Sequence, residues 1–158
     1  MLIYNSMLRL RSAQEFGIGA GGYLGPILFF IMEPLAREKL IRSYLDGYNQ
    51  MNIEGMMEPL DEHVVFENYS SGQKTHSLQG KEPFLKQARE ALAYFSSRKQ
   101  TIKSILHLEE ETEVEISYWA IAAMDFPNGI LKGQEISLEG KSVFRFAAEK
   151  ISSITEYS

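Results

Sequence analysis

Cysteine is absent from this 158-residue sequence. Without it, the chain can form no disulfide and has no thiolate to serve as a metal ligand or a nucleophile. Other metal ligands are sparse as well, because His63, His76 and His107 have no partner at the spacing of a metal site. We therefore predict no bound metal. The lack of cysteine fits the cytoplasm, where we expect the protein, without excluding export.

Basic residues are not concentrated in any part of the chain. Lysine and arginine together number 16, against 21 aspartate and glutamate residues, which gives a formal net charge of −5. Phosphate groups are bound by clustered basic side chains. The sequence therefore predicts no nucleic-acid partner and disfavours other anionic partners.

A long apolar helix is also missing. The apolar run over residues 16–32 is too short to span a bilayer comfortably, and its many glycines make it a poor helix. We predict no membrane contact. The basic start and apolar middle of this region fit a signal peptide, but Met32-Glu33-Pro34 offers no small-residue cleavage site.

Within that region, residues 17–22 match the dinucleotide-binding pattern G-x-G-x-x-G. No convincing strand precedes the match and Pro26 interrupts any helix after it, so we regard the match as accidental and predict no cofactor. Residues 1–33 are interpreted as a dispensable extension, either disordered or the product of a misassigned translation start. Residues 34–158 are predicted to form the one folded domain, because the chain is too short for two ordinary ones.

Helical patterns come first in that domain. A helix is predicted from Pro34 to about Met51, with Arg37 on its polar side and an apolar stripe opposite. The stripe consists of Ala36, Leu40, Ile41, Tyr44, Tyr48 and Met51. A short helix is predicted after the cap residue Asn52, ending near Pro59 before a polar turn at Asp61-Glu62-His63, and a third over 81–97.

Period-two patterns dominate the rest. They predict strands over 64–70, 75–78, 99–109, 112–125, 131–147 and 150–157. Helices followed by hairpin-linked strands indicate an α+β domain with its helices on one face of a curved, mainly antiparallel sheet.

Polar side chains fall among apolar ones in two of these strands. The alternation puts Phe66 and Asn68 on one face and Glu67 on the other, while Ser142 shares a face with Phe144. Two inward polar groups on aromatic-lined strands would suit a small-molecule cavity. They would equally suit an ordinary core with two satisfied hydrogen bonds.

The order of these elements resembles the nuclear-transport-factor-2-like superfamily, in its SnoaL-like and ketosteroid-isomerase-like branch. The residues that carry the resemblance are 44–49 (YLDGYN), 52–56 (NIEGM), 64–68 (VVFEN) and 144–146 (FRF). The resemblance implies three N-terminal helices and a curved sheet that form a cone with a mostly apolar ligand pocket. Family members include isomerases, polyketide cyclases, dehydratases and proteins without catalysis, so the fold does not choose among them.

The isomerase comparison places three family residues on this chain. It puts the oxyanion-hole tyrosine on Tyr44, the general-base aspartate on Asn68 and the proton-donating acid on Ser142. An amide cannot remove a carbon-bound proton, so ordinary ketosteroid isomerase chemistry should fail by that route. Asn68 and Ser142 are better suited to orienting a ligand.

We therefore predict that the cone binds a small, mostly apolar molecule. The predicted ligand-binding residues are Tyr44, Tyr48, Met56, Phe66, Asn68, Tyr118, Ser142 and Phe144. One alternative is a cyclase, dehydratase or isomerase with a different base. Tyr44 and His76 are then the candidate catalytic residues, and either His76 or Glu67 would have to enter the pocket. The other alternative is a non-catalytic association scaffold with a filled cone.

One end of the sheet is predicted to be apolar on both faces. Trp119, Ile121 and Ala123 continue a strand face that begins with charged residues. A large apolar patch commonly marks a contact surface. The sequence therefore predicts a homodimer through this face, or its cover by the N-terminal extension.

Overall fold

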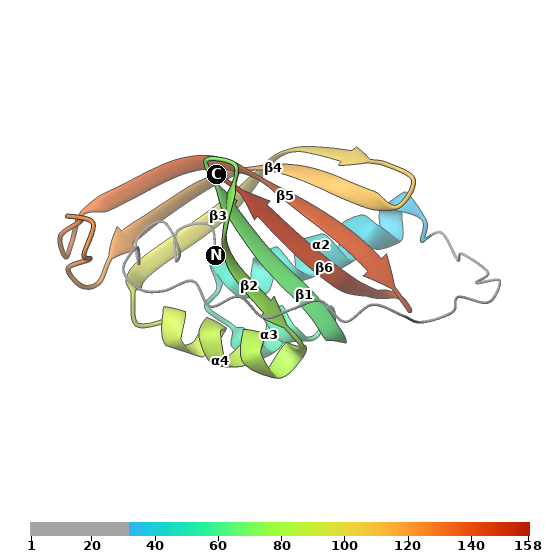
Figure 1. The fold of residues 1–158 in the computed structure, drawn as a ribbon, viewed down its shortest axis with the longest axis horizontal. Coiled ribbons are helices and arrows are strands. Elements are labelled where there is room, and N and C mark those ends of the chain that lie inside the picture. Colours follow the sequence, from blue (N-terminus) through green and yellow to red (C-terminus); the bar gives the residue numbers. More distant parts are fainter. Residues whose placement is uncertain (1–31) are drawn as a thin grey trace.

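The computed structural model describes residues 32–158, so the predictions for residues 1–31 lie outside the described residues. Within residues 32–158, three helices and six strands follow in the predicted α+β order (Figure 1). The helices are α2 (Pro34–Asn49), α3 (Ile53–Met57) and α4 (Lys81–Ala91). The strands are β1 (Leu60–Ser70), β2 (Gln73–Gln79), β3 (Phe95–His107), β4 (Glu111–Ala122), β5 (Glu135–Ala147) and β6 (Lys150–Tyr157).

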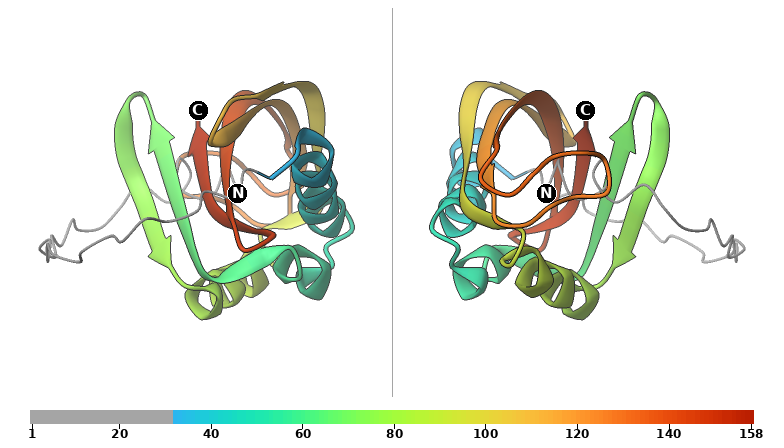
Figure 2. Two further views of the ribbon diagram at one scale, coloured as in Figure 1. Left: turned by 90° about the vertical axis from the view of Figure 1, so that its right-hand side faces the viewer. Right: turned by 90° about the vertical axis from the view of Figure 1, so that its left-hand side faces the viewer.

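The strands form a single sheet in the order β2-β1-β6-β5-β4-β3. Every neighbouring pair is antiparallel except β1 and β6, because the last strand inserts beside the first and runs in the same direction. The sheet curves strongly, and α2 and α4 lie against its concave side (Figure 2). The predicted cone with a mainly antiparallel sheet is confirmed. The concave face of the sheet is called the inner face below.

Local sequence signals explain where the first two helices begin. Pro34 occupies the first turn of α2, where its missing N–H costs nothing and its fixed backbone angle favours the helix. The side chain of Asn52 accepts a hydrogen bond of 3.0 Å from the backbone N–H of Gly55 and so caps α3. Both starts agree with the sequence analysis.

Several predicted boundaries are wrong because tertiary packing overrides the local pattern. Asp61-Glu62-His63 was predicted as a turn but belongs to β1, where a register shift against β6 between Leu60 and Val65 accommodates it. Phe95 was predicted in the third helix but opens β3, where its ring lies 5.8 Å from Phe126. A strand over 131–147 was also predicted too long, since β5 begins at Glu135.

Arg37 is a further correction. Predicted on the solvent side of the first helix, it is only 4% exposed, whereas Ala36 of the predicted stripe is exposed. Its guanidinium donates to the carbonyls of Leu108 and Glu109, each at 2.6 Å, and to that of Met32 at 2.8 Å. Arg37 thus donates hydrogen bonds to carbonyls of the β3–β4 connection that have no backbone donor. These bonds connect α2 to the β3–β4 hairpin.

Candidate functional site

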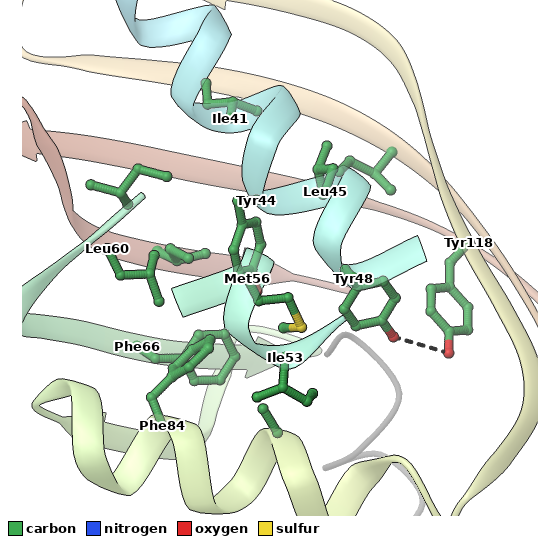
Figure 3. Close-up of a cluster of buried hydrophobic side chains, with 14 of the residues drawn as sticks. Ile41, Tyr44, Leu45, Tyr48, Ile53, Met56, Leu60, Phe66, Phe84 and Tyr118 are labelled. Atoms are coloured by element: carbon green, nitrogen blue, oxygen red, sulfur yellow. Dashed lines mark hydrogen bonds between the residues drawn. The ribbon is translucent and has the colours of Figure 1, made fainter. Parts of the chain in front are cut away.

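All eight predicted ligand-binding residues are buried, and they come from five helices and strands. Tyr44 and Tyr48 lie on α2, Met56 on α3, Phe66 and Asn68 on β1, Tyr118 on β4, and Ser142 and Phe144 on β5. Figure 3 shows Tyr44 and Tyr48 extending from α2 toward the sheet, with Met56 and Phe66 beside them. The helices therefore place the two tyrosines opposite the inner face.

Strand register arranges the inner face in rows. Asn68 on β1 is the partner of Glu156 on β6, and Ser142 on β5 is the partner of the same glutamate. We call Asn68, Glu156 and Ser142 the polar row. Adjacent strands lie about 4.8 Å apart, so these three side chains stand next to one another.

An aromatic row lies two residues along the same strands. There, Phe66 on β1 and Phe144 on β5 flank Ile154 on β6. The Tyr44 ring packs across this row, with centroids 6.2 Å from Phe144 in an edge-on arrangement. The phenol ring of Tyr44 is therefore held among apolar groups.

The amide of Asn68 has a fixed orientation. The Thr75 hydroxyl donates to the backbone carbonyl of Asn68 at 3.2 Å and accepts from Asn68 Nδ2 at 2.7 Å. Because the one hydroxyl proton is already used, Nδ2 must be the donor toward Thr75, which leaves Oδ1 as the free acceptor. Among residues 32–158, neither Asn68 Oδ1 nor the Tyr44 hydroxyl has a hydrogen-bond partner, although both are buried.

Glu156 brings an ionisable group into the polar row. Its side chain is 1% exposed and lies between two polar neighbours. Burial raises the pKa of this carboxyl, because the charged form loses its hydration. The carboxyl consequently holds its proton more readily than a solvated glutamate does.

The three interior tyrosines stay neutral. Burial raises the pKa of Tyr44, and the Glu156 carboxylate adds to that shift. Burial also raises the pKa values of Tyr48 and Tyr118, whose hydroxyls share a hydrogen bond of 3.3 Å (Figure 3). A neutral phenol can donate a hydrogen bond but cannot act as a base near neutral pH.

A buried cation completes the interior. The Arg98 guanidinium lies 3.8 Å from the centroid of the Tyr48 ring and donates through Nε to the Tyr48 carbonyl at 3.2 Å. The Gln100 amide approaches the Tyr48 hydroxyl and lowers its pKa, although neither amide atom reaches the geometry of a full hydrogen bond. Arg98 and Glu156 are thus a cation and a carboxyl buried among neutral polar groups.

The two alternative bases differ in their positions. His76 on β2 is the partner of Asn68, but its Nε2 contacts the Gln87 side chain of α4 and its ring packs 6.3 Å from Phe66. Glu67 points to the outer face, where it accepts from Lys74 at 2.7 Å and from the Tyr69 hydroxyl at 3.2 Å. Glu67 therefore does not reach the polar row.

No group of three potential metal ligands occurs in the part of the chain that the structure describes. Its helices, likewise, include none with the length and apolar character needed to cross a bilayer.

A family model of the SnoaL-like domain matches residues 41–154, which is most of the chain. The chain belongs to the SnoaL-like domain family. The match includes both helix α2 tyrosines and the aromatic row, and it ends two residues before Glu156. No curated protein sequence matches the chain.

Solved structures resemble this SnoaL-like domain at low sequence identity. AclR of Streptomyces galilaeus, a proposed hydroxylase, is 18% identical with a TM-score of 0.63 over 78% of this chain and 89% of its own. An LEH-like epoxide hydrolase of M. tuberculosis is 13% identical with a TM-score of 0.63 over 78% and 82%. A protein of ketosteroid-isomerase-like fold from Catenulispora acidiphila, in complex with trimethylamine, is 12% identical with a TM-score of 0.64 over 76% and 85%. At these identities the likeness establishes the fold.

Several buried polar residues of this SnoaL-like domain were missed by sequence reasoning, among them Arg98, Gln100 and Glu156. A signal for Glu156 was available, because it shares a strand face with the apolar Ile154 two positions earlier. Arg98 was missed because the strand that carries it was predicted to begin one residue later.

Proposed function

We propose that this SnoaL-like domain binds a small, mostly apolar molecule in the interior of the cone, with a polar oxygen of the ligand between Tyr44 and the polar row. The observation that carries this proposal is the pair of buried groups, the Tyr44 hydroxyl and Asn68 Oδ1, that have no hydrogen-bond partner among residues 32–158. Leaving a buried polar group without a partner costs about 1–3 kcal/mol. A ligand that satisfies both groups recovers that free energy on binding.

The surroundings of these two groups define the ligand. Phe66, Phe84 and Phe144 supply an apolar lining, so most of the ligand surface should be hydrocarbon. Tyr44 offers a donor and Asn68 Oδ1 offers an acceptor, which suits a hydroxyl or a carbonyl compound. Among the proteins of similar fold, an epoxide hydrolase and a complex with trimethylamine support small organic molecules as the ligand class.

A matched pair of probes tests the proposal. 2-Naphthol carries one hydroxyl on an apolar bicycle, and naphthalene is the same bicycle without the hydroxyl. We expect the protein to bind 2-naphthol more tightly than naphthalene in a fluorescence titration. Tyr44→Phe should weaken 2-naphthol binding about 5- to 10-fold, the value of one hydrogen bond, and leave naphthalene binding unchanged.

Two further variants sharpen the test. Asn68→Leu keeps the side-chain volume and removes the acceptor, so it should also reduce the preference for 2-naphthol. Tyr69→Phe removes a phenol hydroxyl on the outer face, where Tyr69 bonds to Glu67, and should have no effect on binding. Equal affinity for the two probes would contradict the proposal. Failure to bind either probe would instead favour the association scaffold with a filled cone.

A further inference from the structure

The chain enters the described domain at a groove in its surface. Met32 is the first residue that the structure describes, and it is only 7% exposed. It lines a groove of about 660 Å³ between the start of α2 and the turns of the β3–β4 and β5–β6 hairpins (Figure 1). We call this the hairpin groove. We propose that residues 27–31 (ILFFI) of the same chain occupy it. The proposal is independent of ligand binding in the interior of the cone.

Apolar side chains supply part of the lining of the hairpin groove. Phe146, Ala147 and Ala148, around the β5–β6 turn, line it together with Met32. Within residues 32–158, Phe146 is half-buried and the two alanines are exposed. An apolar occupant would remove this surface from water, which is favourable in proportion to the area buried. The charged residues of the lining are Arg37, Glu109, Glu110, Arg145 and Glu149.

Arg37 holds the parts of the hairpin groove together. Its Nε donates to the Met32 carbonyl at 2.8 Å, and its terminal nitrogens donate to the carbonyls of Leu108 and Glu109, each at 2.6 Å. The guanidinium also lies 5.5 Å from the centroid of the Phe146 ring. The position of Met32 relative to both hairpins is therefore fixed by the fold. A surface formed in advance costs less conformational entropy to occupy.

The sequence before Met32 provides the occupant. Residues 27–31 are five consecutive apolar residues, and Gly25-Pro26 marks where this run begins. Residue 31 is bonded to Met32, and five extended residues span about 17 Å. The segment therefore starts at the groove and needs no linker to reach it. A tethered segment has an effective concentration of about 1 mM or more, so a modest apolar contact is enough to keep it bound.

A second groove also includes Met32 in its lining. It measures about 470 Å³ and is lined by Ala36, Leu40 and Pro59 among others, so we call it the helix groove. The hairpin groove is the larger of the two and offers the Phe146 ring as a partner for the phenylalanines at positions 29 and 30. We therefore assign the segment to the hairpin groove, and the test includes a reporter in each groove.

The absence of cysteine makes a single introduced cysteine a specific reporter. In the full-length chain, Ala147→Cys reports on the hairpin groove, Ala36→Cys on the helix groove and Ser77→Cys on the far edge of the sheet. All three side chains are exposed within residues 32–158. The rate of reaction with a thiol reagent is measured with and without the double substitution Phe29→Ser and Phe30→Ser. The double substitution should accelerate the reaction of Ala147→Cys about 10-fold and leave the other two within about twofold.

Two results of this measurement would overturn the proposal. Equal rates for Ala147→Cys with and without the phenylalanine substitutions would show that the segment does not cover the hairpin groove. Acceleration of Ala36→Cys alone would place the segment in the helix groove instead.

Trp119 reports on a different placement. It is the only tryptophan of the chain and lies on the outer strand face that the sequence analysis considered as a surface for the N-terminal extension to cover. Its fluorescence emission should be the same with and without the two phenylalanine substitutions. A shift to longer wavelength in the substituted chain would place the segment on that face and overturn the proposal.

A cysteine pair tests the contact directly and retains both phenylalanines. Leu28→Cys combined with Ala147→Cys should form a disulfide within one chain on mild oxidation, seen as a change in mobility on a non-reducing gel. Leu28→Cys combined with Ser77→Cys is the control and should not form one. A disulfide-linked dimer of the first pair would show that the groove takes the segment of a second copy, and would overturn the proposal for the same chain.

Discussion

Glu67 and Glu156 are glutamates on neighbouring strands, yet they lie on opposite faces of the sheet. Glu67 points outward and pairs with Lys74 at 2.7 Å, in contact with solvent. Glu156 points inward, is 1% exposed and has a raised pKa because burial removes its hydration. Residue type alone therefore says little about chemistry here. The chemical environment of each glutamate depends on the face of the sheet to which its side chain points.

The contrast extends to other side chains of the same strands. On the outer face, ion pairs such as Glu113–Lys141 at 3.4 Å and Glu111–Arg145 at 3.0 Å are partly exposed, and pairs of this kind contribute little to stability. On the inner face, aromatic side chains surround polar groups that are out of contact with water. The side chains of the inner face therefore contribute most to stability, and the candidate functional groups lie on the same face.

The largest expected change in the free energy of unfolding separates two adjacent residues of β1, Phe66 and Val65. Phe66→Ala removes a fully buried ring from the inner face and should lower the free energy of unfolding by about 3–5 kcal/mol. Val65→Ala, on the outer face, should cost about 1 kcal/mol or less. Urea denaturation of both variants measures the difference. Similar losses would show that the outer face is packed as tightly as the inner one.

A second comparison uses two arginines of α2. Arg37→Ala should lower the free energy of unfolding by about 2–4 kcal/mol, because it leaves the carbonyls of Leu108 and Glu109 without their donor. Arg42→Ala removes an exposed partner of Glu38 on the same helix and should change it by about 0.5 kcal/mol or less. Thermal and urea unfolding provide the measurement, and a small effect of Arg37→Ala would argue against the role of this contact in stability.

A third prediction concerns pH. The pKa of Glu156 is raised in the folded protein, so the folded state binds more protons than the unfolded state above the ordinary glutamate pKa of about 4.3. The free energy of unfolding should therefore fall as pH rises through the window between the unfolded and folded pKa values. Glu156→Gln removes this contribution, so its stability relative to wild type should increase as the pH rises above the ordinary glutamate pKa. A constant difference over that range would mean that Glu156 does not titrate abnormally.

The smallest expected effect on folding comes from the outer face, where we also propose the homodimer contact. Ile121, with Trp119, is half-buried and pairs with Ser97 and Glu135. Ile121→Asp should convert a dimer into a monomer in sedimentation velocity, with little change in secondary structure. Ser117→Asp, farther along the same strand, should leave the assembly unchanged. A wild-type protein that is monomeric at high concentration would end this proposal.

Much of the interior could be predicted from alternation along single strands. Phe66 and Asn68 were predicted on one face with Glu67 opposite, and the structure places them so, because side chains alternate strictly along a strand. The helix starts at Pro34 and Asn52 were also correct, since both depend on local backbone chemistry. Helix and strand ends were less accurate, as Phe95 shows, because an aromatic residue fits either pattern until its packing partners are known.

The sequence by itself determined the family, the order of helices and strands and the inward position of Tyr44, Asn68 and Ser142, because these depend on patterns within short segments. Only the tertiary structure decided that Arg37 is buried in the β3–β4 connection and that Glu156 stands between Asn68 and Ser142. The physical reason is that β6 inserts between β1 and β5, which are far apart in the chain. Register between such strands is set by the packing of the whole sheet, and no local pattern contains it.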